Sequence, residues 1–87
     1  MVYKVEIRPS ARKQLLALPR PAQLEIVQAI DLLAENPRPS GCKKLRGTEF
    51  WRIRIGRFRV IYYIIDKQLR IIILKTSMRQ EDTYRNL

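Results

Sequence analysis

The fold of this chain is most constrained by residues 51–64, which read WRIRIGRFRVIYYI. Gly56 and Arg57 form a two-residue turn signal with glycine first, and apolar side chains alternate with other residues on both sides of it. The pattern predicts a β-hairpin whose strands cover roughly residues 50–55 and 58–65. Such a turn also sets which residues of the two strands lie opposite each other.

The predicted register assigns the hairpin side chains to two faces. Arg54 lies opposite Arg59, and directly opposed residues share a face. Arg52 joins these two, and two like charges facing each other are destabilising by roughly 0.2–1 kcal/mol. The cluster therefore indicates an anion site, because guanidinium forks bind phosphate bidentately. The alternative is a solvated face whose arginines point apart. The other face is expected to be apolar and packed: Trp51, Ile53, Ile55, Phe58, Val60, Tyr62 and Ile64.

The charge balance also favours a polyanionic partner. The 87 residues include 18 Lys and Arg against 8 Asp and Glu, for a formal net charge of +10. Such an excess suits nucleic acid, an acidic protein or an anionic surface. Twelve of the basic residues lie in residues 43–87, so we expect the binding face in the second half of the chain.

The residue types exclude several kinds of chemistry. The chain has no histidine, so the usual general base and the commonest metal ligand are missing. Cys42 is the one cysteine and has no histidine to activate it, so we interpret it as a small residue near a strand. No cofactor is expected. The apolar runs are too short for a membrane span and the first residues do not resemble a signal region, which predicts a soluble, cytoplasmic protein without membrane partners.

The rest of the chain predicts a strand and two helices before the hairpin. Residues 2–7 alternate as a strand does. Ser10 is placed to cap a short helix that Pro19 stops, and Pro21 fits the first turn of a second helix ending near Asn36. The first helix carries Leu15, Leu16 and Leu18. On the second, the apolar residues at helical spacing are Leu24, Val27, Ile30 and Leu33.

After the hairpin, Asp66-Lys67 is a weaker turn signal and residues 69–75 form a third apolar run. A two-residue turn there would place Tyr63 opposite Arg70 and Ile61 opposite Ile72. Residues 79–87 are expected to form a short helix or tail. The order β-α-α-β-β-β predicts a single α+β domain over residues 1–87. In it a helical hairpin packs on one face of a mostly antiparallel four-stranded sheet.

Basic and aromatic side chains near the arginine cluster are typical of single-stranded RNA recognition. Tyr63 shares the arginine face, where it is placed either to stack on a base or to be a partly buried aromatic. Beyond the third strand, Arg79, Tyr84 and Arg85 either extend the binding surface or form a polar C-terminus. The residues predicted to bind RNA are Lys43, Lys44, Arg46, Tyr63, Arg70 and Lys75.

The segments KLRG and WRIRIGRFRVIYYI, the following hydrophobic strand, and an arginine with a later tyrosine resemble the RelE/ParE superfamily of toxin–antitoxin toxins. The RelE branch is most similar. This resemblance implies a ribosome-dependent endoribonuclease that cleaves mRNA in the ribosomal A site, through attack of a ribose 2′-hydroxyl on the adjacent phosphate without a metal. It also implies a RelB-like antitoxin with an acidic or amphipathic segment as partner, and operator DNA contacted only through that complex.

The resemblance also implies roles for individual residues. Arg52 and Arg54 match two basic strand positions, Arg59 a phosphate clamp, Arg79 a C-terminal arginine that assists the phosphate or leaving group, and Tyr84 an aromatic that stacks on a base. The RelE type has lysines at the two strand positions, and arginine is a poor general base. Catalysis would then depend on electrostatic stabilisation, with ribosomal groups, or on Lys75 or Tyr84 as proton carrier.

Two alternatives stay open within the same fold. A ParE-like toxin would inhibit DNA gyrase without nuclease activity, which the arginines at positions 52 and 54 keep plausible. A degenerate member would bind only its antitoxin and operator DNA.

Overall fold

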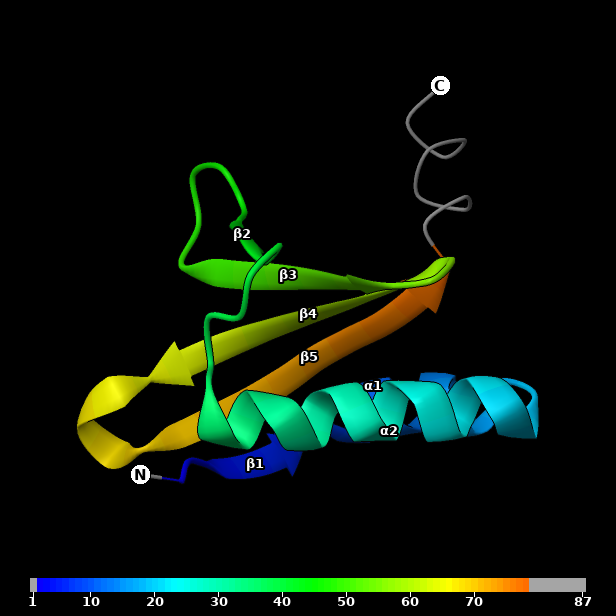
Figure 1. Ribbon diagram of the computed structural model, residues 1–87. Helices are drawn as coiled ribbons and strands as arrows, with labels where there is room; N and C mark the ends of the chain where they lie inside the picture. The colour runs from blue at the N-terminus through cyan, green and yellow to red at the C-terminus, as the bar shows by residue number, and fades with distance from the viewer. Residues whose placement is uncertain (1, 79–87) are drawn as a thin grey trace.

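The computed structural model describes residues 2–78, in which two helices lie along one side of a five-stranded sheet (Figure 1). The strand order is β1-β5-β4-β3-β2. β1 runs parallel to β5, and the other neighbours are antiparallel. The elements are β1 Lys4–Ile7, α1 Pro9–Leu16, α2 Arg20–Glu35, β2 Lys43–Lys44, β3 Phe50–Ile55, β4 Phe58–Ile65, the 3₁₀-helix η1 Asp66–Gln68 and β5 Arg70–Met78.

The predicted α+β fold and element order are confirmed, but the sheet has five strands rather than four. The additional strand is β2, whose Lys43 and Lys44 pair with Arg52 and Trp51 at the sheet edge. Two residues are too few for an alternating pattern, so the sequence did not reveal this strand. The helix or tail predicted for residues 79–87 lies outside the described residues. Within residues 2–78, no helix is long and apolar enough to cross a membrane.

The hydrophobic core lies between the helices and one face of the sheet. Val60 and Tyr62 of β4 and Ile71 and Ile73 of β5 are 0% exposed. Trp51, Ile55 and others pack against the core at its margin. The apolar face predicted for the hairpin is therefore confirmed. Fully burying one such aliphatic side chain contributes roughly 1.5–3 kcal/mol.

The buried stripe of α2 differs from the expected one. Ile30 and Leu33 are buried as expected, but Leu24 is 53% exposed and Val27 39% exposed. The stripe that packs on the sheet consists of Ala22, Ile26, Ile30 and Leu33. Apolar residues occur on more than one side of this helix, so periodicity alone did not select the side that packs.

Proline lies at the start of both helices, whereas the predicted Ser10 cap is not used. α1 begins at Pro9, and Ser10 lies inside the helix instead of capping it. Proline suits the first helical position because its fixed φ matches the helix and its missing N–H is not needed there. Pro21 lies in the first turn of α2, and Asn36 takes the C-cap position, as predicted. β1 begins at Lys4 and is shorter than the predicted strand.

The two hairpins of the sheet differ in how well their register was predicted. In β3–β4, Arg54 lies opposite Arg59 and Arg52 opposite Ile61, as predicted. In β4–β5, Tyr63 lies opposite Ile72 and not Arg70, so the predicted register is wrong by two residues. The connection is longer than a two-residue turn, because η1 is followed by Leu69 in the left-handed region at φ 52°. Since the shift is even, side chains keep their faces.

A bulge in β5 changes which side chains face the core. Tyr62 pairs with Ile73 but Ile61 pairs with Lys75, so Leu74 is an additional residue in β5. Strict alternation after Ile73 would turn Lys75 toward the helices. The bulge instead places Lys75 on the face away from them and returns Thr76, 2% exposed, to the core side.

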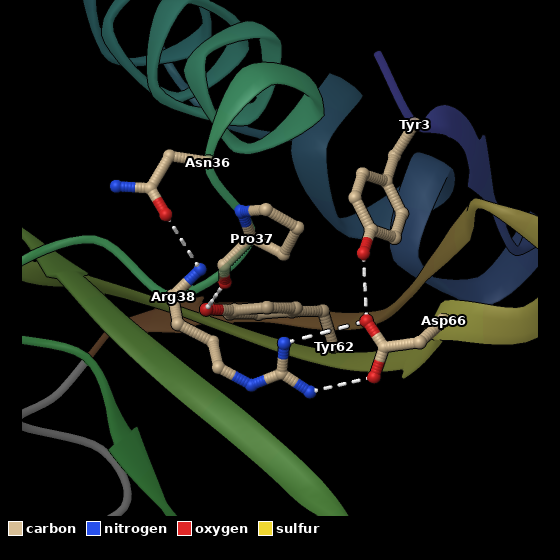
Figure 2. A network of polar contacts seen from close by, with 6 residues as sticks. All are labelled: Tyr3, Asn36, Pro37, Arg38, Tyr62 and Asp66. Carbon is tan, nitrogen blue, oxygen red and sulfur yellow. Dashed lines mark hydrogen bonds and ion pairs between the residues drawn. The ribbon is translucent and has the colours of Figure 1, made fainter. Parts of the chain in front are cut away.

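The loop between α2 and β2 is held by polar contacts from three other elements (Figure 2). The buried Tyr62 hydroxyl donates to the Pro37 carbonyl at 2.7 Å. Arg38 forms an ion pair with Asp66 at 2.9 Å, and the Tyr3 hydroxyl donates to the same carboxylate at 2.7 Å. These contacts join β4, η1 and the residues before β1 to the loop that leads into the sheet edge.

Candidate functional site

The sheet face that points away from the helices carries the predicted arginine cluster. We call it the open face; three of its rows across the strands hold the predicted cluster and its neighbours, and a fourth joins Ile65, Arg70 and Lys4. The first row contains Arg54, Arg59 and Ser77, the second Lys43, Arg52, Ile61 and Lys75, and the third Phe50, Tyr63, Ile72 and Glu6.

In the first row two guanidinium groups come from directly opposed positions. Arg54 is exposed and Arg59 is partly buried. Directly opposed residues have Cβ atoms about 4.5–5.5 Å apart, so both side chains can reach the same anion. Each guanidinium offers a planar fork of donors that matches the oxygens of a phosphate. This pair is the strongest candidate for an anion clamp.

The second row adds positive charge beside that pair. Lys43 is exposed and Lys75 is partly buried, whereas Arg52 is only 6% exposed. Arg52, Arg59 and Lys75 each already contact a neighbouring group. A cation with little water around it is screened less than an exposed one, so Arg52 contributes to the potential of the face even where it does not touch a ligand.

The third row carries two aromatic side chains. The rings of Phe50 and Tyr63 lie edge to face, with centroids 6.2 Å apart and planes at 90°. Phe50 is 39% exposed. Tyr63 was among the predicted RNA-binding residues, but Phe50 was not. The predicted register contained the signal that would have found it, because Phe50 falls opposite Tyr63 within the two predicted strands.

Three predicted RNA-binding residues do not join the first three rows. Arg70 forms an ion pair with Glu6 of β1, and its Nε donates to that carboxylate at 2.5 Å. Lys44 is paired with Trp51, whose side chain is on the helix side, so it is not on the open face. Arg46 is exposed in the turn after β2. Arg79 and Tyr84, two of the predicted catalytic residues, lie outside the described residues.

The open face is better suited to holding an anion than to moving protons. Arginine keeps its proton, whereas lysine can act as a base once its ammonium has lost a proton to become the neutral amine. Within residues 2–78, no three Cys, Asp or Glu side chains gather where they could hold a metal ion. The described chemistry of the face is therefore that of cations beside an aromatic pair.

Comparison with known proteins shows the family to which the chain belongs. The family model of the ParE toxin of type II toxin-antitoxin system, parDE, matches residues 5–83. A protein of Methanocaldococcus jannaschii named as a RelE toxin is 37% identical over 90 residues, which cover 99% of each chain. A protein of Escherichia coli named as RelE-like is 31% identical over 91 residues, covering 100% of this chain and 94% of that protein.

Solved structures show the same fold. The archaeal RelE–RelB complex from Pyrococcus horikoshii contains a chain that is 34% identical, with a TM-score of 0.81 over 91% of this chain and 97% of that one. The RelBE2 toxin–antitoxin complex from Mycobacterium tuberculosis gives 28% identity and a TM-score of 0.81, over 91% and 100%. Together these matches define the class, a toxin of a type II toxin–antitoxin system. The chain belongs to the RelE/ParE superfamily.

Proposed function

We propose that this toxin is a ribosome-dependent endoribonuclease that cleaves mRNA in the ribosomal A site and so stops translation. The observation that carries the proposal is the first row of the open face, where Arg54 lies directly opposite Arg59. Two cations in this arrangement repel each other and gain from an anion between them. Most of the relatives named above are RelE-type proteins, which supports the nuclease over other activities.

The proposed chemistry is attack of a ribose 2′-hydroxyl on the adjacent phosphodiester. Arg54 and Arg59 would hold the non-bridging oxygens, whose negative charge grows in the transition state, and Arg52 would add to the potential beneath them. Arg79 would assist the phosphate or the leaving group. The 2′-hydroxyl proton would pass to the neutral amine of Lys75 or to the phenolate of Tyr84, because arginine does not release its own proton to become a base. The bond from phosphorus to the 5′-oxygen would break as the 2′,3′-cyclic phosphate forms, and the 5′-oxygen would take up a proton from solvent. No metal is required in this scheme.

The proposed regulatory partner is a RelB-type antitoxin. The similar chains from Pyrococcus horikoshii and Mycobacterium tuberculosis were solved in toxin–antitoxin complexes. A net charge of +10 suits an acidic or amphipathic antitoxin segment, which would cover the toxin and also connect it to operator DNA. Action on ribosomes would place the free toxin in the cytoplasm.

The test is to map RNA ends in a translation extract that receives the toxin alone. We expect new ends in translated messages at positions in phase with codons. The double variant Arg54→Ala, Arg59→Ala should lower the cleavage rate by at least about 10²–10³-fold, the usual loss for one transition-state donor. Arg57→Ala is the matched control, because Arg57 lies exposed in the turn. Unchanged RNA ends in an extract whose translation has stopped would contradict the proposal.

The second candidate is a ParE-like inhibitor of DNA gyrase, which the ParE family match and the arginines at positions 52 and 54 favour. In that case the toxin would induce the DNA-damage response in cells whose mRNA stays intact. A third possibility, a member that only binds antitoxin and operator DNA, predicts normal growth when the toxin is expressed without its antitoxin.

A further inference from the structure

We propose that Phe50 and Tyr63 form a nucleobase-binding subsite that reads a base flanking the phosphate held by Arg54 and Arg59. The proposal rests on the proposed RNA substrate and goes beyond it by assigning base recognition to the described sheet. It gives Phe50, to which the sequence assigned no role, a function in choosing the cleavage position.

The Phe50 side chain is large, apolar and exposed. Phe50 is 39% exposed on the face opposite the core, although its neighbours Trp51 and Ile53 are packed toward the helices. Exposed apolar surface forgoes roughly 25 cal/mol per Å² that burial would contribute. A large apolar side chain beside a cluster of cations gains this energy back when a planar apolar ligand covers it. Unstacked bases in single-stranded RNA are such ligands.

The two rings are also arranged so that a base can reach them. In the edge-to-face pair of Phe50 and Tyr63, the planes are at 90° and the centroids 6.2 Å apart. Neither ring can cover both faces of the other in this arrangement, and Phe50 keeps 39% of its surface exposed, so part of that ring is accessible to a base. The Phe50 backbone is also fixed on both sides, because its N–H donates to the Thr48 hydroxyl at 3.0 Å and its carbonyl accepts from the Leu45 N–H at 2.8 Å.

Phe50 lies within reach of an RNA segment bound at Arg54. Phe50 and Arg54 lie on the same face of β3, four residues apart, which is about 13 Å at 3.3 Å per residue. A single strand covers that span in at most about four nucleotides, since successive phosphates are 3.4 Å apart along a stacked helix and farther apart when unstacked. The second row, with Arg52 and Lys43, lies between them, where the RNA backbone would pass. The base would therefore belong to the same substrate segment as the cleaved phosphate.

The experiment uses short single-stranded RNAs that carry 2-aminopurine at one position at a time, with the full-length protein. Stacking quenches the fluorescence of this base, so we expect quenching at one or two adjacent positions. Phe50→Ala should abolish the quenching and weaken binding about 5- to 140-fold, which corresponds to stacking energies of about 1–3 kcal/mol at 1.4 kcal/mol per tenfold. The cleavage positions in a translation extract should lose their base preference.

Three variants separate stacking from structure. Phe50→Trp and Tyr63→Phe keep an aromatic ring and should keep the quenching, whereas Phe50→Leu keeps an apolar side chain without a ring and should lose it. Leu24→Ala removes an exposed apolar group on α2, away from the open face, and should change nothing. If Phe50→Leu quenches like the wild type while Arg54→Ala does not bind, the subsite is wrong and the proposed nuclease stands. If wild-type protein neither binds nor cuts RNA, both proposals fail, and a protein ligand such as the antitoxin is then the candidate occupant.

Discussion

The two faces of the sheet use the same strands for opposite purposes. In β4, the residues that face the helices are Phe58, Val60, Tyr62 and Ile64, and all four are buried. The residues between them, Arg59, Ile61 and Tyr63, are partly buried on the open face. A single strand thus contributes alternately to the core and to the candidate site, one residue apart.

This difference separates stability from function at the level of single residues. The helix side gains free energy from apolar area removed from water, which is non-directional and favours folding. The open face gathers like charges, which oppose folding slightly and favour an anionic ligand. A change on one face should therefore alter the free energy of unfolding with little effect on ligand binding, and a change on the other should do the reverse.

The largest effect on stability is expected from substitutions at two adjacent residues of β5 that face opposite sides of the sheet. Ile73 is 0% exposed, so Ile73→Ala should lower the free energy of unfolding by about 2–5 kcal/mol through lost burial and a cavity. Ile72 lies on the open face and is partly buried, so Ile72→Ala should cost less than half as much. Urea unfolding followed by circular dichroism measures both. Equal losses would mean that the two faces do not differ in packing.

A smaller loss of stability is expected when the hydrogen bond between α1 and the part of β5 beyond its bulge is removed. The Gln14 side-chain oxygen accepts a hydrogen bond from the Thr76 N–H at 2.9 Å. Gln14→Leu would leave this partly buried N–H without its acceptor and should destabilise the fold by about 1–3 kcal/mol. Gln14→Glu retains an acceptor oxygen and is the control. Thermal unfolding that is the same for both variants would contradict this account of the anchor.

A substitution in the arginine pair of the open face should raise the free energy of unfolding instead of lowering it. Arg54→Thr removes the repulsion between Arg54 and Arg59 and should raise the free energy of unfolding by about 0.2–1 kcal/mol, while it lowers the rate of the proposed RNA cleavage. Because salt screens exposed charges, the gain should shrink as NaCl is raised from 0.05 to about 1 M in urea titrations. A variant less stable than the wild type at every salt concentration would show that this face supports the fold.

The smallest effect concerns the exposed network that fixes the loop after α2. Hydrogen bonds from Arg38 and Tyr3 lower the pKa of Asp66 below its ordinary 3.8. A carboxyl with a lowered folded-state pKa stabilises the fold above its ordinary pKa, and this contribution disappears as the pH falls through the lowered value. Asp66→Asn should therefore be less stable than the wild type at pH 7, and the two should converge as the pH falls below about 4. A difference that stays constant from pH 7 to pH 3 would exclude this linkage.

The sequence predicted the parts of the fold that depend on local rules. Glycine in the Gly56-Arg57 turn and the alternation around it gave the register of β3 and β4, which the structure confirms. The register of β4 and β5 was wrong because a 3₁₀ turn replaced the expected two-residue turn. The candidate site follows this division. Arg52, Arg54 and Arg59 share one face, as predicted, while Arg70 forms an ion pair with Glu6 and Phe50 was not among the predicted residues.

The amino-acid sequence by itself determined that three arginines of one hairpin share a face and that the second half of the chain is strongly basic. Turn sterics and the two-residue period of a strand act over a few residues, so they can be read locally. Only the tertiary structure decided that a bulge at Leu74 brings Lys75 to the open face, which side of α2 packs, and that β2 completes the sheet edge. These outcomes depend on pairing and packing between distant segments, where several arrangements satisfy the same local pattern.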